Sequence, residues 1–518
     1  MESQILGIDF GTTNSVIAYV ADAGPQVIQT PTQSSTLPSV VAYRDDELLV
    51  GERAKNAATQ YPYRTLHSIK RYMGSQDPIW LGDEQYEPET LAATVIRALV
   101  DMAETQLQEP VERAVITVPA YFDYQERSAV KHAGELAGLE VERLLPEPTA
   151  ACLPYGLRSK SDATVLVYDL GGGTFDVSLV KVTNGIFQVL GTRGDTSLGG
   201  DDWDGVVVSW LFDELKTAHG IDLQGEPDIE EQLFDAAKKA KHELTNRQRT
   251  TIELPYLAHG DQQYPLEATL TRSDFEQYTA DLLERTVECC ETLLDETDVP
   301  TSTLDEVVLV GGATRMPQIE TMLKETFGCS PSNEVDQDLA VAYGAAIQGA
   351  ILDRQGLPAD DMNRSVEVAS NQQIQPEDVT LLNVAAKPLG VRAQDSDTGE
   401  LRFFELIGRN ETIPTSGNDI FTTIEDEQEY VKSEVLQSQT GDLDDAIVLE
   451  RFRIGPLPPL PAGEPDIQVE FQLDADGVLQ AEVVEQGSGI STSVEAEPEL
   501  DQKRRERLDD VSLPDVIY

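Results

Sequence analysis

The sequence is poor in cysteine, in aromatic residues and in long apolar runs. Four cysteines stand among 518 residues, and their spacing matches no common metal-binding pattern. Four are also too few for a disulfide framework in a chain of this length. Because no stretch of 18 apolar residues occurs, a membrane-spanning helix is not expected. The first residues lack a basic stretch before their apolar run, so we expect no secretory signal and a cytoplasmic protein.

Positive charge is also scarce. Lys and Arg number 38 against 93 Asp and Glu, and the formal net charge is −55. No nucleic-acid partner is expected, because phosphate backbones are bound by concentrated Lys and Arg. The 40% of apolar residues excludes a disordered acidic chain. We interpret the excess of acidic residues as a solvated surface suited to high salt, as in halophilic proteins. The alternative is an acidic surface that selects basic partners. We expect a monomer.

The apolar patterns divide the chain into an α/β part and an all-β part. Short apolar runs typical of strands lie at Ile5–Ile8, Ala114–Val118, Val165–Tyr168 and Val307–Val310. They alternate with helical patterns at Glu89–Gln108, Gln125–Leu136, Ile229–Leu244 and Arg272–Glu296. Polar residues follow, then short strand patterns with turn signals and no long helix. We predict an α/β domain at 1–352, a linker at 353–384, a β domain at 385–495 and a charged tail at 496–518.

One strand-and-turn pattern occurs twice. Ile5–Thr13 resembles Val165–Thr174: an apolar run, then Asp9 or Asp169, then a turn rich in Gly and Thr. Another apolar run follows each turn, which predicts hairpins; no P-loop sequence occurs. Glycines let backbone N–H groups approach a phosphate, and Mg²⁺ could be held by the Asp through water. The duplication suggests two similar lobes that face one ligand.

A third glycine element, Val307–Pro317, combines an apolar strand, a Gly-Gly turn and the start of a helix at Pro317. Such a turn can present backbone donors to a nucleotide. Tight backbone packing is the other explanation.

In this order the three elements resemble the ATPases of the actin, hexokinase and heat-shock-chaperone superfamily. Further segments narrow the resemblance to the seventy-kilodalton heat-shock chaperones of the DnaK type. The matching segments are Gly7–Ser15, Ile116–Phe122, Glu147–Ala151, Val167–Ser178, Gly194–Gly200, Val310–Pro317, Ala340–Ala346, Asn410–Thr415 and Pro465–Leu479. The resemblance implies a two-lobed actin-like ATPase domain, followed by a β-sandwich that binds unfolded or extended polypeptide in protein folding and stress response.

The resemblance also implies roles for individual residues. Lys70, Glu147, Asp176 and Thr174 match the catalytic positions, and Asp9 and Asp169 match the metal positions for Mg²⁺, with K⁺ beside it. The positions that match the ATP or ADP site are Gly11, Thr12, Thr13, Asn14, Gly171, Gly172, Gly173, Thr174, Gly199, Gly200, Lys238, Lys241, His242, Thr245, Gly311, Gly312, Ala313, Arg315 and Asp338. Lys238 stands where relatives carry Glu, which reverses a charge beside the nucleoside.

Other positions match those that couple nucleotide state to peptide binding. They are the allosteric positions Pro119, Arg127, Leu381 and Leu382, and the peptide-cleft positions Val391, Phe421 and Val431. The alternative for the cleft residues is plain sandwich core. In the linker, Thr380 replaces an apolar residue and is expected to weaken docking, because its hydroxyl would lose water. Asn383 replaces Asp there.

The partners implied are unfolded polypeptide clients, a J-domain cochaperone and a nucleotide-exchange factor. The 23 residues after Glu495 are too few for a helical lid, so we expect fast peptide release. Two other functions stay open. One is a peptide-binding scaffold or sensor with weak ATPase activity, and the other is a small-molecule kinase of the same superfamily.

Overall fold

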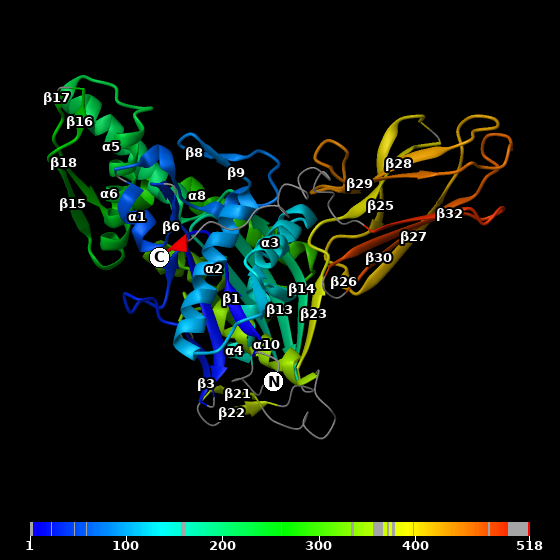
Figure 1. Cartoon of the computed structure of the whole chain (residues 1–518), viewed down its shortest axis with the longest axis horizontal. Helices are drawn as coiled ribbons and strands as arrows, with labels where there is room; N and C mark the ends of the chain where they lie inside the picture. The colour runs from blue at the N-terminus through cyan, green and yellow to red at the C-terminus, as the bar shows by residue number, and fades with distance from the viewer. Residues whose placement is uncertain are drawn as a thin grey trace.

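The structure is a computed structural model. It describes residues 4–21, 23–45, 47–58, 60–156, 162–260, 262–332, 336–355, 366–369, 372–374, 379–396, 398–474, 477–495 and 516–518. Half of the predicted linker and the charged stretch 501–510 lie outside these residues. In Figure 1 the β part extends from one side of the larger α/β part. Among the described residues, no helix is long and apolar enough to cross a membrane.

The first lobe is built on a mixed sheet. Its strands are β1 (Leu6–Asp9), β2 (Asn14–Ala21), β3 (Gly24–Val27), β4 (Leu37–Pro38), β10 (Arg113–Val118) and β11 (Glu140–Pro146), in the order β11-β10-β1-β2-β3 with β4 on β2. Helices α2 (Pro88–Leu107) and α3 (Tyr124–Leu136) supply much of the lobe's apolar core. Smaller elements of this lobe are β5 (Val41–Arg44), β6 (Glu47–Val50), α1 (Glu52–Ala58), β7 (Thr65–Leu66), β8 (Ile79–Leu81) and β9 (Glu84–Tyr86).

The second lobe repeats this arrangement. Its sheet has the order β20-β19-β12-β13-β14-β23-β26. The strands are β12 (Ala163–Leu170), β13 (Phe175–Thr183), β14 (Ile186–Asp195), β19 (Glu306–Val310), β20 (Pro331–Ser332), β23 (Thr380–Val384) and β26 (Thr412–Ile413). Strand β1 pairs antiparallel with β2 and parallel with β10, and β12 pairs in the same way with β13 and β19. Both duplicated turns are therefore hairpin turns, as predicted.

The second lobe contains the predicted helices over Ile229–Leu244 and after Pro317, together with helices that had not been predicted. They are α4 (Glu147–Gly156), α5 (Gly200–His219), α6 (Pro227–Asn246), α7 (Arg272–Tyr278), α8 (Ala280–Glu296), α9 (Pro317–Phe327) and α10 (Ala340–Gln355). The prediction of one helix over Arg272–Glu296 is wrong. The helix is interrupted at the buried Thr279 (φ −102°, ψ 11°), whose hydroxyl and backbone N–H both donate to the carbonyl oxygen of Phe275, at 2.8 Å and 3.1 Å.

Two hairpins between α6 and α7 had not been predicted. They are formed by β15 (Arg249–Leu254) with β18 (Leu266–Thr271), and by β16 (Ala258–His259) with β17 (Gln262–Gln263). A further hairpin, β21 (Val366–Ala369) with β22 (Gln372–Ile374), lies inside the segment predicted as linker. The domain boundaries themselves stay a prediction.

The β part is a sandwich of two four-stranded antiparallel sheets. One sheet has the order β25-β24-β28-β29 and the other β27-β30-β31-β32. The strands are β24 (Leu389–Gln394), β25 (Leu401–Ile407), β27 (Thr415–Phe421), β28 (Val431–Gln437), β29 (Ile447–Ile454), β30 (Ile467–Leu473), β31 (Leu479–Glu485) and β32 (Ser491–Glu495). Alternate residues of β30 and β31 face the buried core, the period-2 pattern read from the sequence. An α/β domain followed by an all-β sandwich is confirmed.

Candidate active site

Three glycine-rich turns meet at the cleft between the two lobes. A Cβ atom on Gly172 would lie 1.6 Å from the hydroxyl oxygen of Thr13, so the two hairpin turns touch. Gly311 has φ +83°, and a Cβ there would lie 2.4 Å from the carbonyl oxygen of Leu170. Side chains cannot be accommodated at these positions, which explains the glycines. The three turns follow one another at intervals of some 160 and 140 residues in the sequence. In the structure they nevertheless form one surface.

The cavity at this point is lined by most of the residues predicted for phosphate and metal. The predicted residues in its wall are Asp9, Gly11, Thr12, Thr13, Asn14, Lys70, Glu147, Asp169, Gly171, Gly172, Thr174, Gly311, Gly312 and Asp338. The sequence analysis missed Thr36 and Gln337, which also line it. The hydroxyl of Thr13 is buried and has no hydrogen-bond partner among the described residues. An unsatisfied hydroxyl facing a polar cavity fits an anionic ligand.

A buried ion pair joins the two sides of the cavity. Lys70, from a short 3₁₀ turn of the first lobe, donates to the carboxylate of Glu147 at the start of α4. Their exposed fractions are 2% and 7%. Since isolated charges are strongly disfavoured at such burial, each group needs the other.

Three further carboxylates, those of Asp9, Asp169 and Asp176, lie near this pair. None of the three forms an ion pair with a cation among the described residues. Burial, and then Glu147, raise the pKa of Asp9 to about 7 and that of Asp176 to about 7. The same two causes raise the pKa of Asp169 well above its usual value. Lys70 lowers all three pKa values by its charge. The site thus holds more negative charge than one lysine balances, and a bound cation would offset it.

No group of three or more His, Cys, Asp or Glu side chains among the described residues is arranged to hold a metal directly. Asp9 and Asp169 lie in the same cavity wall at the ends of two duplicated strands. Two carboxylates are enough for Mg²⁺ that keeps several water ligands. The donor set therefore fits a hydrated Mg²⁺ ion rather than a metal held by protein ligands alone.

The lobes also contact each other beside the cavity. Arg71 donates to the carbonyl oxygen of Gly173 at 2.8 Å and to Asp202 at 2.8 Å. Ser68 donates to Asp201 at 2.7 Å, and His67 lies 3.1 Å from Glu231. These contacts cross from the first lobe to the second, so the cleft is closed on this side.

The residues predicted for the nucleoside lie in two different surroundings. Lys241 is buried and donates to Asp204 and to the carbonyl oxygen of Gly200, both at 2.7 Å. Arg315 is exposed and pairs with Asp338 at 2.8 Å. Thr245 donates to the carbonyl oxygen of Lys241 at 3.3 Å. Lys241 therefore holds the first turn of α5.

Lys238 and His242 line a separate, open hollow of about 510 Å³. Its other lining residues include the cations Lys55 of the first lobe, Lys239 and Arg247, and the acids Asp235 and Glu243. No described ion pair holds Lys55, Lys238 or Lys239. In a chain with so few cations, this hollow is a local concentration of positive charge.

The predicted linker strand is docked on the second lobe. Strand β23 pairs in parallel with β14, with Leu381 opposite Phe187 and Leu382 opposite Gln188. Asn383 accepts a hydrogen bond from the buried hydroxyl of Thr149 at 3.1 Å. The expectation for Thr380 is wrong, because its side chain is exposed and keeps its water on docking. Its backbone N–H donates to Gly185 at 3.1 Å, which any residue could do.

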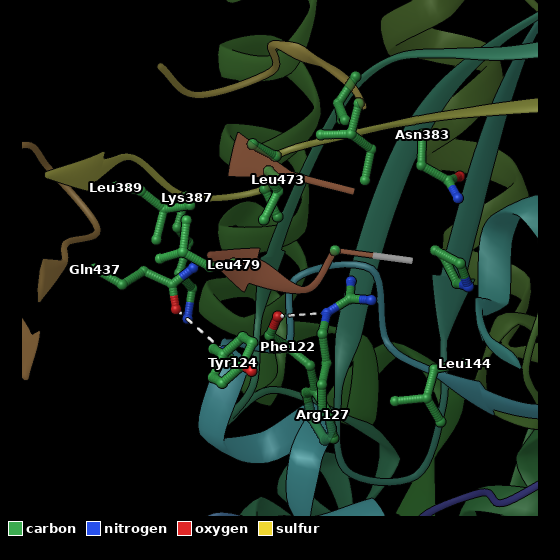
Figure 2. Close-up of a pocket in the computed structure, with 16 residues that line it drawn as sticks. Phe122, Tyr124, Arg127, Leu144, Asn383, Lys387, Leu389, Gln437, Leu473 and Leu479 are labelled. Carbon is green, nitrogen blue, oxygen red and sulfur yellow. Dashed lines mark hydrogen bonds between the residues drawn. The ribbon is translucent and has the colours of Figure 1, made fainter. Parts of the chain in front are cut away.

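A pocket separates the first lobe from the β part, and Figure 2 shows its lining. Arg127 points into it from α3 and donates to the carbonyl oxygens of Phe122, at 3.1 Å, and Ala120, at 3.0 Å. Pro119 begins this same loop, and its carbonyl accepts from Phe122 at 3.2 Å. Across the pocket, Gln437 of the β part accepts from the backbone N–H of Tyr124 at 3.1 Å.

Tyr121 connects the cavity to the β part, a link that the sequence analysis missed. Its backbone N–H donates to Asp176 at 3.0 Å. Its ring faces the ammonium group of Lys387 at 4.9 Å and the guanidinium of Arg409 at 5.9 Å. Lys387 also lies 3.8 Å from Asp123. Tyr121 thus contacts Asp176, which lies near the Lys70–Glu147 pair, and two cations of the β part.

The three predicted peptide-binding residues belong to the apolar cluster of the sandwich. Val391 is 1% exposed, so this arrangement leaves it no free surface for a ligand. Phe421 and Val431 are partly buried, and the Phe421 ring meets that of Phe404 edge-on at 5.6 Å. Ile424, beyond β27, is 64% exposed.

Comparison with known proteins gives the family. A profile described as Hsp70 protein matches residues 5–79 and 78–511. Two relatives are the proteins named "Chaperone protein DnaK" of two Halobacterium salinarum strains, R1 and NRC-1. Each is 41% identical over 528 residues, covering 98% of this chain and 80% of the relative. These halophilic relatives agree with the high-salt interpretation of the composition. The chain belongs to the Hsp70 family, whose members are ATPases, and is a DnaK-like chaperone.

Proposed function

We propose that the chain hydrolyses ATP in the cleft between its lobes and uses the nucleotide state to control how the β part holds extended polypeptide. One observation carries this proposal. The buried pair of Lys70 and Glu147 lies where the three glycine turns meet. Phosphoryl transfer requires charge neutralisation and an aligned water more than covalent chemistry. A fixed cation, a fixed carboxylate and backbone donors are groups that can supply both.

Within this site, Lys70 would neutralise charge near the γ-phosphate and help to position the attacking water. Glu147 and Asp176 would accept hydrogen bonds from that water or from water around the metal. The hydroxyls of Thr13 and Thr174, both in the cavity wall, would donate to phosphate oxygens. Adjacent glycines would add backbone donors.

Magnesium would be held by Asp9 and Asp169 through water, and the family resemblance adds potassium beside it. The crowded carboxylates support a cation here, because burial and their mutual repulsion raise their pKa values. Binding of Mn²⁺, followed by electron paramagnetic resonance, would test the site. Asp9→Asn should weaken Mn²⁺ binding in the presence of ADP; Asp77→Asn, at an exposed loop position, is the control.

The nucleotide state would reach the β part through the loop of residues 119–122. Asp176 binds the backbone of Tyr121 on one side of this loop, and Lys387 and Arg409 face its ring on the other. Pro119 and Arg127 would set the shape of the loop. A shift of Asp176 on hydrolysis would change these contacts and weaken the pairing of Leu381 and Leu382 with β14.

The β part would take unfolded or extended clients in a cleft that includes Phe421 and Val431, with backbone pairing to the peptide. Val391 would become accessible only after the sandwich rearranges. A J-domain cochaperone and a nucleotide-exchange factor would be the further partners. We propose a cytoplasmic monomer, in keeping with the strong negative charge.

Steady-state ATP hydrolysis in molar KCl, with and without an apolar peptide, tests this function. Stimulation by the peptide supports a coupled chaperone. Equal basal activity in both conditions would show hydrolysis without coupling, and no hydrolysis would refute the ATPase assignment.

A second candidate, a peptide-binding scaffold with weak ATPase activity, is favoured by the hollow that contains Lys238. Three lysines without described ion pairs line it, where relatives place an acidic residue beside the nucleoside. Weak ADP binding by the unmodified chain, rescued by Lys238→Glu, would favour this candidate.

A further inference from the structure

A short strand near the last described residue lies on the edge of a small sheet in the first lobe. Strand β33 (Val516–Ile517) runs parallel to β6, with Val516 opposite Leu48 and Ile517 opposite Leu49. The sheet has the order β33-β6-β5-β7. In Figure 1 this strand lies beside β6 and α2, whereas β32, the preceding described strand, lies in the far part of the sandwich. The chain therefore returns across the molecule to reach this edge.

The two last side chains fit apolar surface on either side of β6. Ile517 packs against the cluster formed by Val40, Ala42, Leu49, Ala54 and Ala57. Tyr518 packs against the main core of the first lobe. The Tyr518 hydroxyl bonds to Thr105 of α2, and burial and then Asp101 raise the pKa of Tyr518. An aliphatic and an aromatic residue thus each find a matching surface, in addition to the backbone pairing.

We propose that the edge of β6 and the adjoining face of α2 form a binding site for an extended aliphatic–aromatic segment. Its occupant is the chain's own Val516–Tyr518, which acts as a strap between the β part and the first lobe. This is peptide recognition by strand addition, in which the backbone supplies affinity and side-chain pockets supply specificity.

The apolar character of the segment supports this choice of occupant. Val516–Tyr518 carries no charged side chain, whereas the chain as a whole has 93 acidic residues. The edge strand β6 has the sequence Glu-Leu-Leu-Val, and its last three residues are buried. Asp101 and Glu104 of α2 both pair with Arg97, and all three charges act on Tyr518, so charge repulsion does not select the occupant. The apolar contacts of Ile517 and Tyr518 do.

The site is small enough to open. Only two residues of β33 pair with β6, and Ile517 and Tyr518 both stay partly exposed. The connection that keeps the segment close is the chain between Glu495 and Val516, 20 residues (496–515) that can reach at most about 70 Å. Binding therefore depends on the effective concentration that this connection provides.

A strap has a consequence for the docking of the β part. The β part is connected to the α/β part once through β23 and again through Val516–Tyr518. Undocking of the β part would require the second connection to extend or its strand to leave β6. Occupancy of the β6 site therefore favours the docked arrangement, in which β23 pairs with β14.

Hydrogen exchange on the whole protein without nucleotide tests both parts of the proposal. Ile517→Asp should increase exchange at least tenfold across β6 and should also increase exchange across β23. The strands β12 and β13, which are distant from the site, should keep their protection and show that the variant folds. Equal exchange at β6 in the variant and the unmodified chain would overturn the binding site.

A second variant separates the strap from the strand. Insertion of 20 Gly and Ser residues after Asp501 leaves Val516–Tyr518 intact but doubles the connection. The effective concentration should then fall about threefold, because it varies roughly as the −3/2 power of length. Exchange at β6 and β23 should rise by a similar factor. No change at β23 in either variant would overturn the strap.

A peptide with the sequence of residues 512–518 gives an independent test of the site. Added to the Ile517→Asp variant, it should restore protection of β6, whereas the same peptide with Asp at its Ile517 position should not. Failure of the matching peptide at millimolar concentration would overturn the site. None of these measurements depends on ATP hydrolysis, so they stand or fall separately from the proposed function.

Discussion

Replacement of Lys70 by Ala is the most direct test of the proposed chemistry. Lys70 is 2% exposed and pairs with Glu147, and its charge lowers the pKa of Asp9, Asp169 and Asp176. Without it, four acidic groups would face one another in a buried cleft. One or more of them would take up a proton near neutral pH, because burial already raises the pKa of Asp9 and Asp176 to about 7.

Loss of one preorganised hydrogen-bond donor at a reacting centre lowers turnover by about 10²–10³, or about 2.7–4 kcal/mol. We expect a decrease of that size for Lys70→Ala. The affinity for ADP should change less than about tenfold, which is 1.4 kcal/mol, because the glycine turns remain. Removal of one partner of a buried pair destabilises a protein by about 3–5 kcal/mol when the other stays charged. The Lys70→Ala/Glu147→Gln double variant should therefore be more stable than Lys70→Ala, yet equally inactive.

The assay is single-turnover ATP hydrolysis with Mg²⁺ in molar KCl, together with thermal unfolding and binding of a fluorescent ADP analogue. Lys181→Ala is the matched control, because Lys181 is exposed on β13 and lies outside both the cavity wall and the open hollow. Turnover of Lys70→Ala within tenfold of the unmodified protein would refute the role given to Lys70.

Four further outcomes are expected. Thr380→Leu should leave linker docking unchanged within about twofold, because Thr380 is exposed, whereas Asn383→Leu should weaken it by removing the bond from Thr149; linker proteolysis measures both, and equal effects would contradict the structure. Burial and then Asp123 raise the pKa of Glu126 from 4.5 to about 7, so its contribution to stability is present below pH 4.5 and lost as pH rises through 7. Glu126→Gln should raise the melting temperature at pH 8 more than at pH 5, and a uniform shift would argue against this cause. The melting temperature of the unmodified chain should rise steeply from dilute to molar KCl, since the Debye length falls from about 30 Å at 0.01 M to about 3 Å at 1 M; a flat profile would remove the high-salt interpretation. Lys238→Glu should change ADP affinity measurably without changing the rate of the chemical step, which single-turnover kinetics at saturating ATP can separate.

Much of the fold could be predicted because its signals are local. The Asp–Gly-rich turns after Ile8 and Tyr168 predicted two hairpins, since each turn is fixed by a few adjacent residues and flanking apolar runs. The strands of the sandwich showed alternating apolar and polar residues, because only one face of each sheet is buried. The interruption at Thr279 was missed because the apolar periodicity continues through it, and only this one residue separates α7 from α8.

The structure brings most of the residues predicted for phosphate and metal into one cavity wall, and their roles stay a prediction. The glycines, Lys70 and Glu147 are close together because the turns leave no space for other residues. Lys241, which matches a nucleoside position, pairs with Asp204, and no pattern in the sequence connects the two residues. No sequence pattern indicated that the side chain of Thr380 would be exposed, so its effect on docking was predicted wrongly. Its exposure depends on which side of β23 faces solvent after pairing with β14.

The sequence alone determined the duplicated lobes, the α/β-then-β order and the surplus of acid, because these follow from local geometry and composition. Tertiary structure alone decided which distant groups meet. Tyr121 contacts Asp176, Lys387 and Arg409, and Ile517 reaches a cluster around Leu49, across separations of 55 to more than 450 residues. Such contacts depend on the packing of whole sheets against one another. The energy of any one pair is too small to produce a recognisable sequence pattern.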